Sequence, residues 1–168
     1  VQGSDTLLFD GYGYADLEFE VSTPADAVYE IGSITKQFTA AAVLRLAEED
    51  SIDLDADVGE YLPDLRTRGH EVPVRRLLNH TSGIRSYTAM PMFRSEIFEK
   101  DLPRDTLVTL IGSEPFDFEP GTALIYNNSG FFLLGLIIEE VSGQSYEEYV
   151  KEHLFGPAGM EDSYYCDE

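Results

Sequence analysis

The sequence predicts an α+β fold in which short amino-terminal strands precede a mainly helical remainder. Residues 1–20 mix apolar residues with glycines and aspartates, which is typical of strand, turn and strand. Apolar runs of helical character then recur along the rest of the chain. With 168 residues, 43% of them hydrophobic, the chain is long enough for one packed core and too short for two ordinary domains.

Start and stop signals place a series of helices after the strands. An apolar helix is expected from about Ser33 to Glu49, because a glycine-containing turn leads into a run rich in alanine, valine and leucine. Ser145 and Glu148 have the spacing of a capping box, which predicts a final helix reaching about Leu154. Other helices are expected to end near residues 61–63 and to cover residues 74–78, 105–111 and 130–141.

The chain is strongly acidic. It carries 32 acidic residues against 11 lysines and arginines, for a formal charge of −21. This charge repels nucleic acids and anionic membranes, so neither is expected as a partner. Two origins of the acidity stay open, namely adaptation to high salt, where counterions screen the self-repulsion, and an ordinary solvated acidic surface.

The sequence contains no stretch that predicts a membrane span. No apolar run reaches the roughly 18 residues that a span requires, and the run 131–138 is stopped by Glu139 and Glu140. We therefore expect a soluble protein. The chain begins with valine and shows no signal-type segment, so we expect it to be part of a longer protein whose localisation the sequence does not indicate.

No metal site or cofactor is expected. His70 and His153 have no partner at metal-ligand spacing. The aspartates of residues 53–57 resemble a calcium loop, but a calcium-binding EF-hand needs glycine and glutamate where this chain has Val58 and Asp64. We expect these aspartates to cap a short helix instead. The single cysteine, residue 166, lies in a polar tail, which argues against a catalytic role.

Ser33 and Lys36 form a Ser-x-x-Lys motif at the expected start of the first helix. A serine hydroxyl is a weak nucleophile and needs a neighbouring base, and residues three apart on a helix lie on the same face. A lysine can serve as that base when it is neutral, which burial and a helix start both favour. Taken alone, the motif also fits a serine N-cap followed by a solvated lysine.

A second cluster of polar residues follows the helix expected at 74–78. Gly83 suits a left-handed turn there. His80 lies two residues from Ser82, but the sequence around Ser82 lacks the Gly-x-Ser-x-Gly elbow of serine–histidine hydrolases. We therefore expect His80 to be structural.

Five segments, in this order, resemble motifs of one known family: residues 11–16, 33–39, 77–83, 120–130 and 134–160. They resemble the serine beta-lactamase and penicillin-binding-protein superfamily, in its branch of class C-like beta-lactamases, esterases and D-alanyl-D-alanine carboxypeptidases. The resemblance implies a beta-lactamase/transpeptidase-like fold and no cofactor. Several ordered matches also outweigh the reading of Ser33 as a simple helix cap.

The resemblance also implies roles for individual residues. Ser33 would be the acylated nucleophile and Lys36 its base. Tyr126 would carry protons as a second shuttle, and Asn128 would bind substrate and the lysine. The segment 77–83 resembles the scaffold turn of the family.

One part of the family pattern is missing from the sequence. Its third motif, Lys-Thr-Gly or His-x-Gly on a late strand, would lie beyond Glu168. That strand supplies one of two backbone donors to the oxyanion hole, and the loss of one donor costs about 10²–10³ in rate. We therefore expect residues 1–168 to form a single partial domain that lacks the carboxy-terminal strands.

Two hypotheses about function follow. In the first, the assembled protein is a serine hydrolase that acts through an acyl-enzyme on an ester or amide, such as a beta-lactam, a D-Ala-D-Ala peptide or a small ester. In the second, the chain is a non-catalytic binding or structural fragment of the same fold. The expected partners are a small-molecule or peptide substrate and either a complementary chain or a second copy of this chain, because open strand edges favour association.

Overall fold

The computed structural model describes residues 2–93 and 102–165. The chain divides into two compact units, Val1–Ser33 and Ile34–Glu168. Cys166 lies outside the described residues, so its expected lack of a catalytic role stays a prediction. Within the described part, no helix is both long and apolar enough to cross a membrane.

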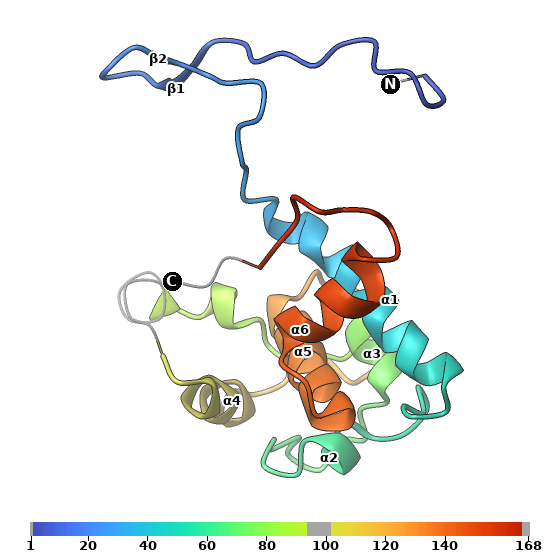
Figure 1. The fold of residues 1–168 in the computed structure, drawn as a ribbon. Helices are drawn as coiled ribbons and strands as arrows, with labels where there is room; N and C mark the ends of the chain where they lie inside the picture. The colour runs from blue at the N-terminus through green and yellow to red at the C-terminus, as the bar shows by residue number, and fades with distance from the viewer. Residues whose placement is uncertain (1, 94–101, 166–168) are drawn as a thin grey trace. The chain divides into compact units, whose positions relative to one another are not determined.

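The first unit contains a small antiparallel hairpin. Strands β1 (Tyr14–Asp16) and β2 (Val21–Ser22) pair with each other (Figure 1). The Asp16 carboxylate accepts a hydrogen bond from the Phe19 backbone N–H (2.8 Å), which stabilises the turn between the strands. The predicted pattern of strand, turn and strand is confirmed in kind, but the strands lie later in the chain than expected, because the turn forms at this aspartate rather than at Gly11 or Gly13.

The second unit is helical, and its helices match the predicted positions within a few residues (Figure 1). Most boundaries shift by one to three residues because caps and fraying decide where a helix ends. The elements are α1 (Thr35–Glu48), α2 (Val58–Tyr61), α3 (Val74–Leu78), the 3-10 turn η2 (Tyr87–Ala89), α4 (Arg104–Ser113), α5 (Asn128–Ser142), α6 (Tyr146–Val150) and the π-helical turn η4 (Lys151–Phe155). The predicted α+β class is confirmed, with helices as the larger part.

Helix α5 forms the centre of the second unit. It packs against α1, α3 and α6. Four of its apolar side chains are fully buried: Leu133, Leu134, Ile137 and Ile138. Burial of each stabilises the fold by roughly 1.5–3 kcal/mol relative to an exposed side chain. The apolar run 131–138 therefore lies in the core of this unit. Its burial holds α5 in place, and Asn128 is the first residue of that helix.

Side-chain caps fix three of the helix starts. Ser145 and Glu148 form the predicted capping box of α6, and the Asn127 side chain accepts a hydrogen bond from the Gly130 N–H at the start of α5. Asp57 caps α2, because one of its oxygens accepts a hydrogen bond from the Gly59 N–H (2.8 Å) and the other from the Val72 N–H (2.6 Å). This confirms the capping interpretation for Asp57, whereas Asp55 pairs with Arg75 and Asp53 accepts a hydrogen bond from the Asp55 N–H.

The segment directly after α3 pairs through backbone hydrogen bonds with residues 117–121. The Asp117 N–H donates to the Gly83 carbonyl, and the Gly121 N–H donates to the Thr81 carbonyl, both at 2.8 Å. Gly83 has φ +76°, which confirms the predicted left-handed turn. The backbone of Phe118 lies so close that a Cβ at Gly83 would sit 2.0 Å from its carbonyl oxygen. Only glycine fits here without moving the backbone.

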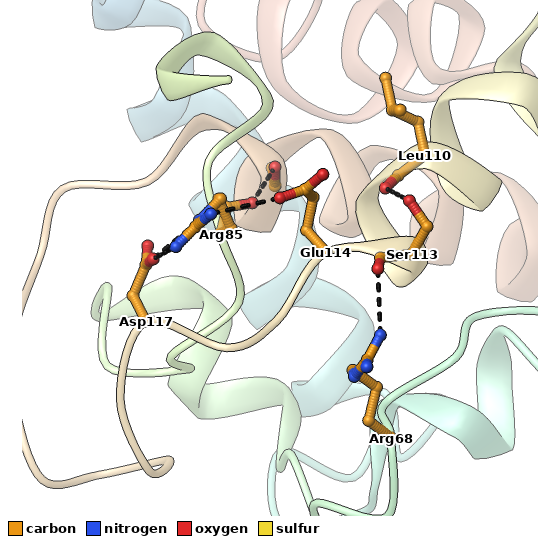
Figure 2. A network of polar contacts seen from close by, with 7 residues as sticks. Arg68, Arg85, Leu110, Ser113, Glu114 and Asp117 are labelled. Atoms are coloured by element: carbon orange, nitrogen blue, oxygen red, sulfur yellow. Dashed lines mark hydrogen bonds and ion pairs between the residues drawn. The ribbon is translucent and has the colours of Figure 1, made fainter. Parts of the chain in front are cut away.

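Arg85, two residues after Gly83, binds two acidic residues at and after the end of α4 through its side chain (Figure 2). Its guanidinium donates to Asp117 Oδ1 (2.7 and 2.8 Å) and to Glu114 Oε2 (3.2 Å). The hydrogen bond that Arg85 donates to Asp117, followed by the charge of Asp117, raises the pKa of Arg85 above the ordinary value. These contacts tie the segment that follows Gly83 to the chain after α4.

Candidate active site

Ser33 lies in a 3-10 turn, Gly32–Ile34, directly before α1. The N-cap residue of α1 is Ile34, and no side chain caps this helix start. Ser33 therefore does not act as the N-cap, which removes the simpler interpretation of the Ser-x-x-Lys motif. Ser33 is the last residue of the first compact unit, whereas Lys36, Tyr126 and Asn128 belong to the second. The contacts described below are those among residues of the second unit.

Three of the predicted site residues meet in the second unit. The Lys36 amine on the first turn of α1 donates a hydrogen bond to Asn128 Oδ1 at 2.7 Å. The same nitrogen lies 4.9 Å from the centre of the Tyr126 ring and 5.5 Å from the centre of the Phe131 ring. Aromatic faces at this distance attract a cation, so the two rings and the amide all contact the amine.

The segment 127–129 is fastened to the segment 84–88 by several hydrogen bonds. The Asn127 side-chain amide donates to the Ile84 carbonyl. The Ser129 hydroxyl donates to the Arg85 carbonyl (2.8 Å) and accepts from the Tyr87 N–H (2.8 Å). Asn127 and Ser129 are both buried. We call this pairing of residues 84–88 with residues 127–129 the clasp, and it sets the start of α5 relative to η2.

His80 adds a contact that the sequence did not predict. Its ring lies between Tyr126 and Phe131, with ring centres 4.8 and 5.1 Å apart. Its Nδ1 accepts a hydrogen bond from the Asn127 N–H at 3.2 Å. Burial, followed by the charge of Lys36, lowers the pKa of His80 below its ordinary value. A neutral imidazole with a free Nδ1 lone pair is the form that this hydrogen bond requires.

The backbone of His80 is unusual as well. Its φ of +60° lies in the left-handed region, which few non-glycine residues adopt. His80 adopts this conformation two residues after the last residue of α3, directly after the C-cap residue Asn79. The expectation that His80 is structural stays in agreement with these contacts, but the ring supports the candidate site directly rather than a distant part of the fold.

A cavity of about 240 Å³ opens beside the amine. Its walls include Lys36 and Asn128 together with the aromatic rings of Tyr87 and Phe131. An apolar wall with a few polar groups is the usual composition of a small-molecule site. The amine and the amide of the candidate site therefore border a space that small groups can enter.

No group of three or more metal-ligating side chains occurs in the described ranges 2–93 and 102–165. His70 instead stacks on Phe116, with ring centres 4.3 Å apart, and lies 3.2 Å from a carboxylate oxygen of Glu119. His153 packs against Tyr149. Both histidines thus have aromatic neighbours within the helical unit.

Comparison with known proteins identifies the family. The family model described as Beta-lactamase matches residues 1–167. The chain belongs to the Beta-lactamase family. Penicillin-binding protein 4* of Bacillus subtilis is 32% identical over 164 residues, a match that covers 96% of this chain and 36% of that protein. The resemblance seen in the sequence motifs is thereby confirmed.

Solved structures of Beta-lactamase relatives share the fold of this chain. The octameric penicillin-binding protein homologue from Pyrococcus abyssi superposes with a TM-score of 0.76 at 38% identity, covering 94% of this chain and 37% of the other. A D-stereospecific amidohydrolase from Streptomyces sp. superposes with a TM-score of 0.72 at 39% identity, covering 78% of this chain and 42% of the other. The chain therefore has the fold of the serine hydrolases of this family, and it spans about two fifths or less of these relatives.

Proposed function

We propose that this chain carries the nucleophile and the proton-transfer residues of a serine hydrolase that forms an acyl-enzyme with an ester or amide. Ser33 is the nucleophile, Lys36 its base, Tyr126 a second proton carrier, and Asn128 a substrate-binding residue. The observation that carries the proposal is the position of the Lys36 amine, 2.7 Å from Asn128 Oδ1 and against the ring of Tyr126. The order of motifs shared with the Beta-lactamase family supports it.

The proposed reaction has two halves. In the first, Ser33 Oγ attacks the carbonyl carbon of the substrate while its proton passes to Lys36 Nζ. The bond to the leaving group then breaks, and the leaving group takes a proton through the Tyr126 hydroxyl. In the second half, water attacks the acyl-enzyme, gives its proton to the same pair of residues, and releases the acid and the free Ser33 hydroxyl.

Asn128 would act on both partners. Its side-chain oxygen holds the Lys36 amine, and its side-chain NH₂ group is a donor that can bind the acyl part of the substrate. The backbone N–H of Ser33 would supply one donor to the oxyanion. By the family resemblance, the other donor belongs to the third motif.

Covalent labelling tests the proposal. The protein is treated with a fluorophosphonate and, separately, with benzylpenicillin, and the labelled residue is identified by mass spectrometry. We expect addition at Ser33, loss of addition in Ser33→Ala, and no change in Ser51→Ala, which removes another exposed serine hydroxyl. Lys36→Met should lower the labelling rate by about 10²–10⁴-fold, the usual contribution of a general base.

A second candidate function rests on the short span of the chain. Because the chain covers only 36% of penicillin-binding protein 4*, a non-catalytic binding or structural fragment of the fold is the alternative. Absence of label on Ser33 at saturating reagent would favour this alternative. Labelling without subsequent turnover would instead show an intact nucleophile whose oxyanion site lacks its second donor.

The substrate is proposed only by class. Benzylpenicillin, D-amino acid amides and small aryl esters cover the beta-lactam, amide and ester classes that the acyl-enzyme chemistry allows. The D-stereospecific amidohydrolase among the relatives supports the amides as the first to test. A faster rate for the D than for the L form of the same amide would support this choice.

A further inference from the structure

We propose that Ser86 and Thr88 are positioning residues that hold the Asn128 side-chain amide with its oxygen toward Lys36. The proposal deepens the proposed function and rests on it for the catalytic consequence. The geometry itself is independent of any activity. It concerns two hydroxyls to which neither the sequence motifs nor the family resemblance assigned a role.

The three residues form a closed ring of hydrogen bonds. The Asn128 backbone N–H donates to Ser86 Oγ at 3.1 Å. The Asn128 side-chain Nδ2 donates to Thr88 Oγ1 at 3.0 Å. The two hydroxyl oxygens, Ser86 Oγ and Thr88 Oγ1, lie 2.9 Å apart and bond to each other. Each polar group of Asn128 that faces η2 therefore has a partner.

The direction of these bonds decides the orientation of the amide. A backbone N–H and a side-chain NH₂ can only donate, so both hydroxyls accept from Asn128. The remaining group of the amide, Oδ1, can only accept, and it faces the donating amine of Lys36 at 2.7 Å. If the amide were rotated by half a turn, its NH₂ group would face the amine, donor against donor. Thr88 disfavours that rotamer when its hydroxyl donates to Ser86 Oγ, because no hydrogen is then left to donate to Oδ1.

The hydroxyls are held in place by the clasp. Ser86 is only 7% exposed. The residues on either side of it are bonded to Ser129, through the Arg85 carbonyl and the Tyr87 N–H, both at 2.8 Å. The Arg85 side chain is in turn fixed by Glu114 and Asp117 (Figure 2). Because these hydrogen bonds restrict the backbone around Ser86, the hydroxyls can fix the orientation of the Asn128 amide. Hydroxyls on a mobile loop would move with the amide instead.

This arrangement also leaves a donor for the substrate. The Nδ2 group has two hydrogens, and Thr88 takes one of them. The second hydrogen can then bind an acyl oxygen while Oδ1 stays on Lys36. One amide can thus serve substrate and base together only in the orientation that Thr88 selects.

The first test is spectroscopic and needs no catalysis. In ¹⁵N-labelled protein, the side-chain NH₂ signals of Asn128 are assigned by their loss in Asn128→Asp, and their exchange with water is measured. We expect exchange to be at least about tenfold faster in Thr88→Val and Thr88→Ala than in the wild type, because a protecting hydrogen bond is lost. Thr88→Ser should exchange like the wild type. Equal exchange in all four proteins would overturn the proposal.

The second test follows the rate at which the fluorophosphonate labels Ser33. Thr88→Val should slow labelling by about tenfold or more, as expected when the half-buried Asn128 amide loses its partner, and Thr88→Ser should restore it to within about twofold. Thr106→Val, at an exposed threonine on α4, is the matched control and should label like the wild type. A serine variant as slow as the valine variant would contradict the proposal, since a purely steric role would give that result.

The two tests separate the two proposals. If the wild type takes no label at Ser33, the proposed hydrolase function fails, and the exchange of the Asn128 amide still decides the positioning role. If Ser33 is labelled at the same rate in the wild type and Thr88→Val, the function stands and the positioning role fails.

Discussion

Gly83→Ala should destabilise the protein far more than an ordinary glycine substitution. The new Cβ would lie 2.0 Å from the Phe118 carbonyl oxygen and 3.2 Å from a carbon of the Phe116 ring. To restore an allowed contact, the backbone around residues 83 and 118 must separate by about 1 Å or more. The φ of +76° adds the strain of a left-handed alanine, about 1–2 kcal/mol.

The separation would also break backbone hydrogen bonds. The bond from the Asp117 N–H to the Gly83 carbonyl and the bond from the Gly121 N–H to the Thr81 carbonyl are both 2.8 Å long, and stretching each by about 1 Å takes it beyond hydrogen-bonding distance. A buried group left without a partner costs about 1–3 kcal/mol. Strain and the two lost bonds together predict a loss of about 3–8 kcal/mol in the free energy of unfolding.

Gly69→Ala is the matched control. Gly69 also has a left-handed φ, +87°, but a Cβ there would meet no atom within 4 Å. It should therefore cost only the strain, about 1–2 kcal/mol. Urea unfolding followed by circular dichroism or tyrosine fluorescence suits this chain, which has ten tyrosines and no tryptophan. Free energies of unfolding that agree within about 0.5 kcal/mol for the two variants would refute the contact argument.

Four further predictions concern charge. Burial and the charge of Lys36 lower the pKa of His80 from its ordinary 6.5, so the unfolded chain binds this proton at higher pH than the folded chain. Stability should therefore fall as the pH drops through about 6.5. The urea midpoint should fall less in His80→Asn, which keeps an acceptor near the Asn127 N–H. Asp57→Ala should cost about 2–3 kcal/mol in urea unfolding through the loss of the α2 cap and of the hydrogen bond from the Val72 N–H, whereas Asp55→Ala, on the exposed surface, should cost under about 1 kcal/mol. Potassium chloride between about 0.05 and 1 M should raise the melting temperature, because salt screens the net charge of −21; a flat curve would contradict this. Calcium should leave the melting temperature unchanged relative to potassium chloride of equal ionic strength, and a specific rise would contradict the capping role of Asp57.

The sequence predicted the helices well because their signals are local. The capping box of Ser145 and Glu148 lies within four residues, and the apolar run of α5 is continuous. The amino-terminal hairpin was misplaced because the glycines at 11 and 13 compete with Asp16 as turn formers. The Asp16 side chain accepts a hydrogen bond from the Phe19 N–H, and that bond decides the turn.

The supporting residues of the site could not be predicted from the sequence. The motifs indicated Lys36, Tyr126 and Asn128, and the structure brings these three together. His80 and Thr88 touch partners about 40 residues away in the sequence, so no local pattern marks them. Serine and threonine are also common in loops, where most of them serve turns.

The bond between Lys36 and Asn128 joins positions 92 residues apart in the chain. Closing so long a loop is entropically unfavourable, and the cost grows with the logarithm of its length. During synthesis, Lys36 leaves the ribosome well before Asn128. The hydrogen bond between them can therefore form only after the first residue of α5 has been synthesised.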